Sequence, residues 1–562
     1  MVVSVGEMNR EFTRRAQSLS LEVDCLADGD VNSDLLIVSE APGYREKEMK
    51  LPLVGASGKF LWDVLAKFNI RRQHCYITNV VKRQLVDSPH SGGAKAGVSR
   101  NELAHWNALL RWEVEQLPNV KYVLILGDMA LNALCDVQGI SAWRGSVLQD
   151  GTRSYIITNN PAFLLYKPSL QPIFYQDVSK LDMVRRGQWR AHDIHEIINP
   201  TPLEAIQWCD KMIQEGEPVS FDIETTGGET ACIGFANQAH EGMCINFRER
   251  DTNRWSVADE RRVRSSIQRV LRHSRVRLVA QNGGFDCGWL WYKDRINPKG
   301  LYIDTLLAHH TLHPTWPHNL GFLTAQYTTH PFYKDEKDEW REGGDIDSFW
   351  RYNVKDCCIT WEVARRLEQE LRSQQMWDFF QDHVMALQPW LIQATVLGNK
   401  VDLPMRERLN TEYSADVDRL AIEFRDLARI ATGVADLDVN PLSPKQLGTL
   451  LFQQLRLVGK TTSTDEENRN AMIENPRTPE PARRMLLKLN EFKEQHKLFS
   501  TYIKAAVDPD GRMRSDYKQY GTQYVPGRLS SAQTLWGSGM NLQNQPERLR
   551  GMFIADRMVF ND

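Results

Sequence analysis

The sequence contains no long hydrophobic run. None of its apolar stretches approaches the ~18–20 residues that cross a bilayer, and residues 1–18 lack the apolar core of a secretory leader. These absences argue against a membrane partner and predict a cytoplasmic protein.

Cysteine is scarce and poorly spaced for metal binding. The nine cysteines among the 562 residues are scattered, no two of them form a CxxC pair, and only Cys357 and Cys358 are adjacent. This spacing excludes a disulfide framework and a zinc or iron–sulfur cradle, so we expect reduced thiols.

A large net charge is missing as well. The chain carries 69 Lys+Arg against 72 Asp+Glu, a net charge of -3, which excludes a histone-like polycation. The average conceals a local difference, because residues 481–562 carry 13 Lys+Arg and 8 Asp+Glu. This basic excess leaves a nucleic-acid partner open for that part of the chain.

The hydrophobic pattern predicts a multidomain α/β protein. Short apolar strands alternate with amphipathic helices over residues 31–180, and a second such segment extends to about residue 372. Long helical patterns follow, and the last eighty residues lose this periodicity. A polar stretch over residues 185–200, with Asn-Pro and Thr-Pro, predicts a linker between the two α/β segments.

Two carboxylates lie on one predicted strand, in the segment FDIETTG. Positions i and i+2 of a strand project to one face, so Asp222 and Glu224 point together while Phe221 and Ile223 face the core. Neighbouring carboxylates repel each other, and a bound divalent cation is a common compensation. The tripeptide alone is also typical of a solvated strand end.

Two further segments add acids to this pair. Asp286 follows the apolar stretch VRLVA at a predicted strand-to-helix junction, and Tyr352 and Asp356 share one face of a predicted helix at i,i+4 spacing. Two Mg²⁺ or Mn²⁺ ions ~3.5–4 Å apart stabilise in-line attack of water on a phosphodiester, and oxygen ligands alone suffice for them. Together these acids offer the oxygen ligands of a divalent-cation site.

These four acids and one tyrosine, in this order, resemble the DEDD exonuclease pattern with a tyrosine in its third motif. Residues 200–372 are thus similar to the 3′–5′ proofreading exonuclease of family-A DNA polymerases, which implies an RNase H-like domain. The alternative is an inactive relative that has kept the acids.

The resemblance also implies a role for each residue. Asp222, Glu224 and Asp356 would hold the metal on the nucleophile side, Asp222 with Asp286 would hold the metal on the leaving-group side, and Tyr352 would orient the attacking water. Single-stranded DNA 3′ ends are the implied substrate.

A histidine-rich segment follows the third acid. His309, His310, His313 and His318 suggest a zinc site, but their irregular spacing and the prolines among them predict a surface loop instead. Asp304, which opens the segment DTLLAHH, also resembles a family residue and is expected to support the fold.

Residues 380–562 resemble the thumb and the first palm segment of the same polymerases, a mostly helical region with an incomplete palm. The segments that carry the resemblance are residues 398–402, 440–447, 497–502, 527–531 and 541–548. By this resemblance Arg528 reaches the minor groove at the primer terminus, and Asn541, Gln543 and Arg548 contact primer-template. Arginine and amide side chains suit this role, because they bond groove acceptors that all base pairs share.

The sequence ends before the segment that, in the family, carries the polymerase aspartates and the fingers lysine. We therefore expect that this chain alone cannot extend a primer, and that a downstream segment or a second chain completes the palm. The alternative is a non-catalytic DNA-binding subunit of a split polymerase. A phage-encoded chain would act in the cytoplasm of its bacterial host.

Residues 1–190 contain three segments, SEAPG, LPLVGASG and YITNVVK, that resemble the uracil-DNA glycosylase superfamily in its iron–sulfur branch. The resemblance implies a pocket for a flipped base. In such a pocket Asn79 would read a uracil edge, Glu40 would position water, and Asn160 would lie in the second catalytic motif.

The same segment departs from this pattern at several positions. Leu53 stands where the family has a stacking phenylalanine, and Asn160-Pro161 replaces the His-Pro of the second motif. Arg83 and Trp106 stand where cluster cysteines are expected, so we predict no iron–sulfur cluster. The alternative to an active glycosylase is a DNA-binding or structural domain.

Overall fold

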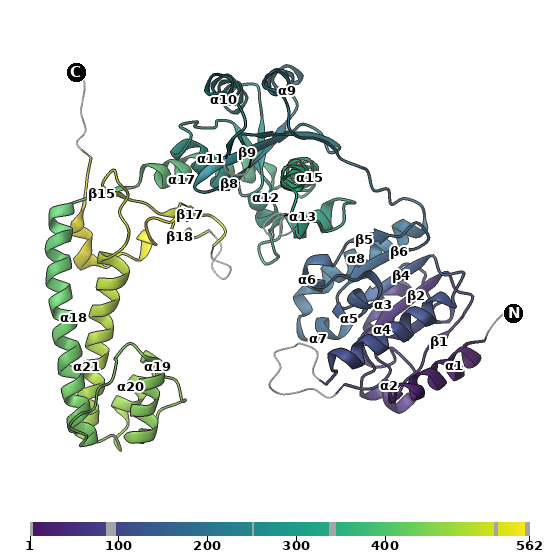
Figure 1. Cartoon of the computed structure of the whole chain (residues 1–562), viewed down its shortest axis with the longest axis horizontal. Coiled ribbons are helices and arrows are strands. Elements are labelled where there is room, and N and C mark those ends of the chain that lie inside the picture. Colours follow the sequence, from purple (N-terminus) through teal and green to yellow (C-terminus); the bar gives the residue numbers. More distant parts are fainter. Residues whose placement is uncertain are drawn as a thin grey trace. The chain divides into compact units, whose positions relative to one another are not determined.

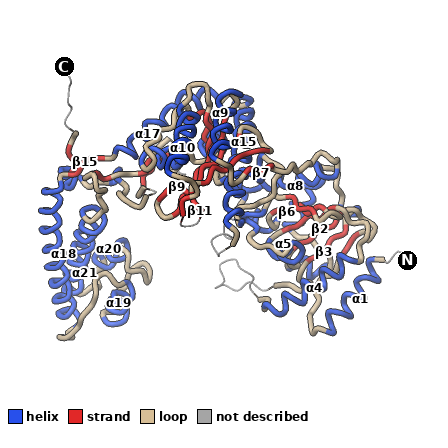
Figure 2. The backbone as a smooth tube through the Cα atoms, turned by 45° about the horizontal axis from the view of Figure 1, so that its top comes forward, coloured by secondary structure: helices blue, strands red, loops and turns tan. Residues whose placement is uncertain are grey.

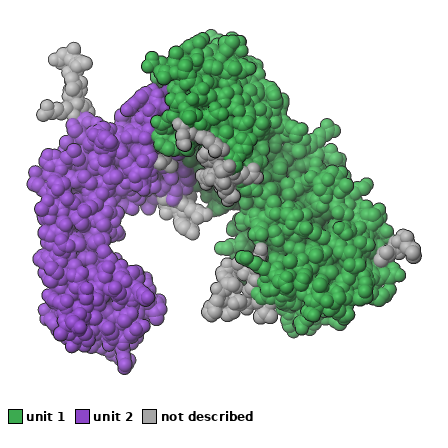
Figure 3. All heavy atoms as spheres, viewed as in Figure 1, with its two compact units in different colours: residues 1–283, 298–380 green, residues 284–297, 381–562 purple. Residues whose placement is uncertain are grey.

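The computed structural model describes residues 4–85, 97–249, 252–336, 344–521, 527–534 and 536–556. The chain forms two compact units, shown in Figure 3. One unit contains residues 1–283 and 298–380, and the other contains residues 284–297 and 381–562. The two α/β sheets belong to the first unit, and the long helical pair belongs to the second.

The first sheet has the strand order β1-β3-β2-β4-β6-β5. Its strands are β1 (Asp28–Gly29), β2 (Leu35–Ser39), β3 (Tyr76–Asn79), β4 (Tyr122–Leu126), β5 (Val147–Gln149) and β6 (Ser154–Thr158). The four inner strands are parallel, and the two edge strands are antiparallel to their neighbours. The predicted alternation of strands and helices over this segment is confirmed.

Helices cover both faces of the first sheet. One face packs against α1 (Val5–Ser18), α4 (Arg100–Glu115) and α5 (Asp128–Cys135), and the other against α3 (Ala56–Ala66), α7 (Pro161–Tyr166) and α8 (Gln171–Arg185). Successive residues of β2 therefore enter different cores: Leu36 and Val38 lie in the first, Leu35 and Ile37 in the second. Burial on both faces explains why β2 is a continuous apolar run.

The second sheet has the strand order β14-β13-β8-β9-β10-β7 (Figures 1 and 2). Its strands are β7 (His195–Ile197), β8 (Val219–Thr226), β9 (Glu229–Ala236), β10 (Glu241–Asn246), β13 (Leu278–Ala280) and β14 (Leu301–Asp304). The helices of this domain include α9 (Pro202–Glu215), α10 (Val257–Arg272), α12 (Thr305–Leu312), α13 (Leu320–Tyr327) and α15 (Ile346–Ser373). The α/β pattern predicted for the second segment is likewise confirmed.

The long helix α15 lies directly on β8, β9 and β10. Two glycines on the sheet make this close approach possible: a Cβ on Gly234 would overlap the amide of Asn353, and one on Gly242 would lie 3.0 Å from Cys358 Sγ. The helix in turn presents Val354, Cys357 and Cys358 to the sheet as part of a buried cluster. The absence of a side chain at Gly234, on β9, therefore sets how near α15 lies to the sheet.

The predicted linker is only partly a linker. Residues 186–194 have neither helix nor strand, but His195–Ile197 forms β7, which pairs in parallel with β10 at the edge of the second sheet. The polar composition that indicated a linker fits an edge strand with one exposed side equally well.

The domain that contains the first sheet contacts the domain that contains the second sheet, through α8 and α13. The Lys180 ammonium donates to the carbonyl of Ala325 in α13, and the Phe332 N–H donates to Ser146 Oγ at 2.9 Å. Lys180 is buried, which lowers its pKa to about 7. The two α/β domains therefore share a polar interface.

The second unit is built on two long helices, α18 (Leu403–Thr432) and α21 (Glu480–Lys497), which pack along each other. Their shared core also contains residues of α19 (Pro444–Gly448) and α20 (Glu466–Glu474). Ser443 caps α19 by accepting from the Gln446 N–H, and Pro444 occupies the first turn. The short strands of this unit are β15 (Asn399–Val401), which precedes α18, and β16 (Arg512–Met513), β17 (Asp516–Lys518), β18 (Ser530–Ala532) and β19 (Phe553–Ile554), which follow α21.

Two shorter helices, α11 (Gly284–Tyr292) and α17 (Ala386–Leu397), pack against each other in the second unit. Within the described parts of the chain, no helix combines the length and the apolar character that crossing a bilayer requires.

Replacing Gly234 with alanine tests the contact between α15 and the sheet. The new Cβ would lie 2.7 Å from Cys357 Sγ and overlap Asn353, so we expect a loss of about 1–3 kcal/mol in unfolding free energy. Urea denaturation of the full chain measures it. The matched control is Gly6→Ala in α1, where the nearest atom lies 4.0 Å away. Equal midpoints for both variants would contradict the close approach.

Candidate active site

Three carboxylates converge where α15 crosses β8. Asp222 and Glu224 come from β8 and Asp356 from α15, and one oxygen of each lies within 4.8 Å of the other two. The strand supplies the first pair because alternate residues share a face, and α15 supplies the third through its contact with the sheet. Three such acids repel one another at neutral pH, so the arrangement favours a bound cation.

Asp356 is held by two side chains from the loop after α13. Tyr333 Oη donates to Asp356 Oδ1 at 2.5 Å, and Lys334 Nζ lies 2.5 Å from both carboxylate oxygens. Lys334 Nζ also donates to Tyr352 Oη at 2.8 Å. The ammonium therefore offsets part of the negative charge of the cluster and joins Asp356 to Tyr352.

Tyr352 is suited to donate a hydrogen bond and poorly suited to act as a base. Burial, followed by the charges of Asp356, Glu224 and Asp222, raises the pKa of Tyr352 far above its ordinary value. The phenol therefore keeps its proton near neutral pH. In this state it can orient a water molecule but cannot deprotonate it.

Asn353 fixes the position of Asp222. Its Nδ2 donates to Asp222 Oδ2 at 2.8 Å and to the Asp222 backbone carbonyl at 3.2 Å. Sequence reasoning missed Asn353, although it lies between Tyr352 and Asp356 on the helix. It also missed Tyr333 and Lys334, for which no local pattern gives a signal, because they reach the site from a loop.

The fourth acid, Asp286, lies in the first turn of α11 and is 3% exposed. This helix belongs to the second compact unit, whereas the other three acids belong to the first. The loop that leads to α11 is held by Asp304, which accepts from the backbone N–H groups of Asn282 and Gly283 at 3.0 and 2.8 Å.

Asp304 also caps α12 by accepting from the Leu306 and Leu307 N–H groups. Burial raises its pKa to about 6, although these backbone hydrogen bonds act in the opposite direction. The expectation that Asp304 supports the fold is confirmed.

The predicted loop contains His313 and His318, both half-buried, but not the other two histidines. His309 and His310 lie on α12, and His309 is fully buried. His318 approaches both, with ring nitrogens 2.7 Å from His309 and 3.1 Å from His310. Burial lowers the pKa of His309 to about 2, so this ring stays neutral. Proline spacing was misleading because α12 ends before the first proline.

The three candidate pocket residues of the first domain lie at the ends of its strands. Glu40 follows β2, and its carboxylate accepts from Asn160 Nδ2 at 2.9 Å and from the Met129 N–H at 3.1 Å. Asn79 ends β3 and is 2% exposed, and its Nδ2 is buried without a hydrogen-bond partner. The backbone carbonyl of Asn79 accepts from the buried Lys82 ammonium at 2.8 Å.

Arg83 and Trp106, which stand where cluster cysteines were expected, both bond to the carboxylate of Glu102. Arg83 Nε lies 2.8 Å from Glu102 Oε1, and the Trp106 indole N–H donates to the same oxygen at 3.2 Å. Neither a guanidinium nor an indole ligates iron, so these positions do not fit an iron–sulfur cluster.

Two of the segments predicted to bind DNA meet in the second unit. Ser531 Oγ, from the GRLSS segment, donates to Asn541 Oδ1 at 2.7 Å, and the same oxygen accepts from the Gln543 N–H at 3.0 Å. This bond ties β18 to the NLQN turn. Arg528 is exposed and lies just before β18.

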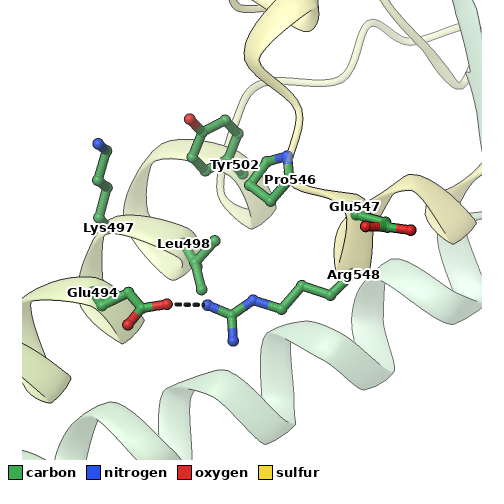
Figure 4. Close-up of a pocket in the computed structure, with 7 residues that line it drawn as sticks. All are labelled: Glu494, Lys497, Leu498, Tyr502, Pro546, Glu547 and Arg548. Carbon is green, nitrogen blue, oxygen red and sulfur yellow. Dashed lines mark hydrogen bonds and ion pairs between the residues drawn. The ribbon is translucent and has the colours of Figure 1, made fainter.

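Arg548 lines a hollow of 600 Å³ in the same unit, and its guanidinium lies 2.8 Å from Glu494 (Figure 4). One side of the hollow is formed by α21 and the residues directly after it, and the other side by the segment Glu547–Met552. Its lining residues are Glu494, Lys497, Leu498, Tyr502, Pro546, Glu547 and Arg548. The ion pair is exposed, so a DNA phosphate can compete for the arginine at little cost.

Comparisons with known proteins cover the three segments in order. Residues 26–181 match the uracil DNA glycosylase superfamily, residues 200–372 match the 3′–5′ exonuclease, and residues 406–561 match DNA polymerase family A. The DNA polymerase of Escherichia phage T5 is 23% identical over 478 residues, which cover 77% of this chain and 54% of that protein. Residues 200–561 are thus similar to the exonuclease and polymerase segments of family-A DNA polymerases.

Other relatives match parts of the chain. DNA polymerase I of Synechocystis sp. is 28% identical over 300 residues, covering 51% of this chain and 28% of that protein. A type-4 uracil-DNA glycosylase of Pyrobaculum aerophilum is 31% identical over 163 residues, covering 27% of this chain and 78% of that protein. The resemblances drawn from all three segments are thus confirmed, and the chain spans about half or less of the polymerases it matches.

Removing Lys334 tests its role in this exonuclease domain. Its ammonium competes with a divalent cation for Asp356, so Lys334→Met should lower the Mn²⁺ concentration that gives half-maximal nuclease activity by roughly threefold or more. Metal titrations of the nuclease rate measure this shift. Lys355→Met is the control. Lys355 lies next to Asp356 on α15, but its ammonium pairs with Glu336. An unchanged or increased metal requirement in Lys334→Met would contradict the competition.

Proposed function

We propose that this chain is a metal-dependent 3′–5′ exonuclease that removes nucleotides from DNA 3′ ends within a family-A replicative polymerase. The convergence of Asp222, Glu224 and Asp356 within 4.8 Å is the observation that carries this proposal. The match of residues 200–372 to the 3′–5′ exonuclease supports it.

The donor set fits Mg²⁺ or Mn²⁺. Asp222, Glu224 and Asp356 offer only oxygen ligands, which these hard cations prefer. Two such ions would supply a nucleophilic water and stabilise the charge on the leaving oxygen. Asp286 is the residue proposed to complete the second metal site with Asp222.

The chain's own side chains position the reacting groups. Asn353 holds Asp222 in one orientation, and Tyr333 does the same for Asp356. The protonated phenol of Tyr352 would donate a hydrogen bond to the attacking water, which leaves proton removal to a different group. Preorganisation of this kind lowers the barrier because the polar groups need not reorient during the reaction.

The C-terminal residues would hold the DNA. Arg528, Asn541, Gln543 and Arg548 are proposed to contact primer-template, and the hydrogen bond between Ser531 and Asn541 supports a shared surface for two of these segments. Binding through phosphates predicts an affinity that falls steeply with salt. The phage T5 relative supports action in the cytoplasm of a bacterial host.

The exonuclease proposal is tested with 3′-labelled single-stranded DNA and Mg²⁺. The full chain should release mononucleotides, and Asp222→Asn should lower the rate by about 10²–10³-fold, because removing a metal ligand costs several kcal/mol of transition-state stabilisation. EDTA should abolish the release. The control is Asp210→Asn, which alters an exposed ion pair with Arg269.

No release by the wild-type chain would overturn this proposal and favour a non-catalytic DNA-binding subunit. Equal loss of rate in Asp210→Asn and Asp222→Asn would show a general effect of charge rather than a metal site.

A second function, excision of uracil from DNA, is favoured by one observation in the first domain. The Asn79 side chain is buried, yet its Nδ2 has no hydrogen-bond partner, which is costly unless a ligand supplies one. A carbonyl oxygen of a flipped uracil is such an acceptor. Glu40, held by Asn160 and the Met129 N–H, lies at the end of the neighbouring strand β2 and could position water.

Uracil-containing DNA tests this second function. Incubation with the chain should produce alkali-labile sites, and Asn79→Ala should reduce their rate by about tenfold or more, since the base loses a buried hydrogen bond. Gel electrophoresis after alkali treatment counts the breaks. Asn101→Ala, an exposed change on α4, is the control. Absence of alkali-labile sites with the wild-type chain would leave this domain with DNA binding or a structural role.

A further inference from the structure

Three side chains that commonly bind metals meet in the first unit, apart from the carboxylates of the exonuclease site. His192 lies in the linker between α8 and β7, His330 lies in the loop after α13, and Glu362 lies on α15. One nitrogen or oxygen atom of each lies within 4.8 Å of the other two. Three segments that are distant in sequence thus supply one possible ligand each.

One polar atom of each of these three side chains has no hydrogen-bond partner. His192 Nε2, His330 Nε2 and Glu362 Oε2 are all buried from solvent, and none of them is hydrogen-bonded. The two imidazole rings lie nearly perpendicular, at 79°, with centroids 4.8 Å apart. Buried polar atoms are almost always paired, so three unpaired atoms in one cluster of side chains indicate a missing ligand.

An ion pair alone does not explain the cluster. His192 Nε2 lies 3.5 Å from Glu362 Oε2, close enough for a salt bridge if the histidine is protonated. That pairing would still leave His330 Nε2 buried without a partner. The neighbouring cation Lys355 does not fill this role, because its ammonium is bonded to Glu336 at 2.7 and 2.8 Å.

The spacing is close to that of ligands around a single ion. Tetrahedral zinc with bonds of about 2.0–2.1 Å places its ligand atoms about 3.3 Å from one another. The distance of 3.5 Å between His192 Nε2 and Glu362 Oε2 agrees with this value. Two imidazoles and one carboxylate are a donor set that zinc accepts, with water in the fourth position.

We propose that His192, His330 and Glu362 bind a zinc ion. The ion fastens the linker between the two α/β domains to α15 and to the loop after α13, which also carries Tyr333 and Lys334 of the exonuclease site. This site is distinct from the exonuclease carboxylates and does not depend on the proposed nuclease activity.

Cobalt provides the test, because Co²⁺ bound by four nitrogen and oxygen ligands absorbs visible light much more strongly than six-coordinate Co²⁺. The full chain is stripped with a chelator and titrated with Co²⁺ and then with Zn²⁺. We expect one equivalent of the intense Co²⁺ spectrum, its displacement by Zn²⁺, and a rise of roughly 5 °C in the melting temperature with Zn²⁺.

Variants separate this site from the exonuclease. His192→Ala and the isosteric Glu362→Gln should each reduce the Co²⁺ signal at least tenfold, with circular dichroism confirming that both variants fold. His195→Ala should keep the signal, because His195 lies in the same segment but pairs with Glu241 and has a 71% exposed side chain. Asp222→Asn should also keep it, because the carboxylate site offers only oxygen ligands.

Three results would overturn the proposal. The first is no intense Co²⁺ spectrum from the wild-type chain, which would mean that the three atoms share only a bound water. The second is a signal that persists in Glu362→Gln. The third is a signal that disappears in Asp222→Asn, which would place the ion at the exonuclease carboxylates.

Discussion

The close contact between α15 and the second sheet is the constraint on which the exonuclease site depends. A single helix brings Tyr352, Asn353 and Asp356 to the strand that carries Asp222 and Glu224. The contact is possible because the sheet has glycine where a larger residue would push the helix away. Six residues after Asp356, the same helix presents Glu362 to His192 and His330.

Electrostatics explains why so many polar side chains surround the three acids. Carboxylates within 4.8 Å of one another destabilise the folded state unless donors or cations offset their charge. Asn353, Tyr333 and Lys334 provide such donors and one positive charge. These side chains hold the three carboxylates in position without a bound cation.

The sequence predicted the parts of the fold that depend on local patterns. Short apolar runs that alternate with amphipathic helices located the strands of both sheets, and i,i+2 and i,i+4 spacing identified Asp222 with Glu224 and Tyr352 with Asp356. Contacts between distant segments could not be predicted in this way. Lys334 reaches Asp356 from a loop, and nothing in its neighbourhood marks it.

The histidines show the same division between local and distant information. Proline spacing suggested a loop, but apolar neighbours at Leu306 and Leu307 and a cap from Asp304 favour a helix there. His309 is buried because other segments cover it, including His318 and Phe322. Whether a histidine is exposed is decided by what packs over it, which spacing along the chain does not record.

The interface between α8 and α13 makes the two α/β domains of the first unit depend on each other. The Lys180 ammonium is buried, and the Ala325 carbonyl in the neighbouring domain is one of its acceptors. Cutting the chain between these domains would expose the ammonium to water and remove that acceptor. A fragment that ends at the linker would therefore present a charged surface where the full chain has a buried polar contact.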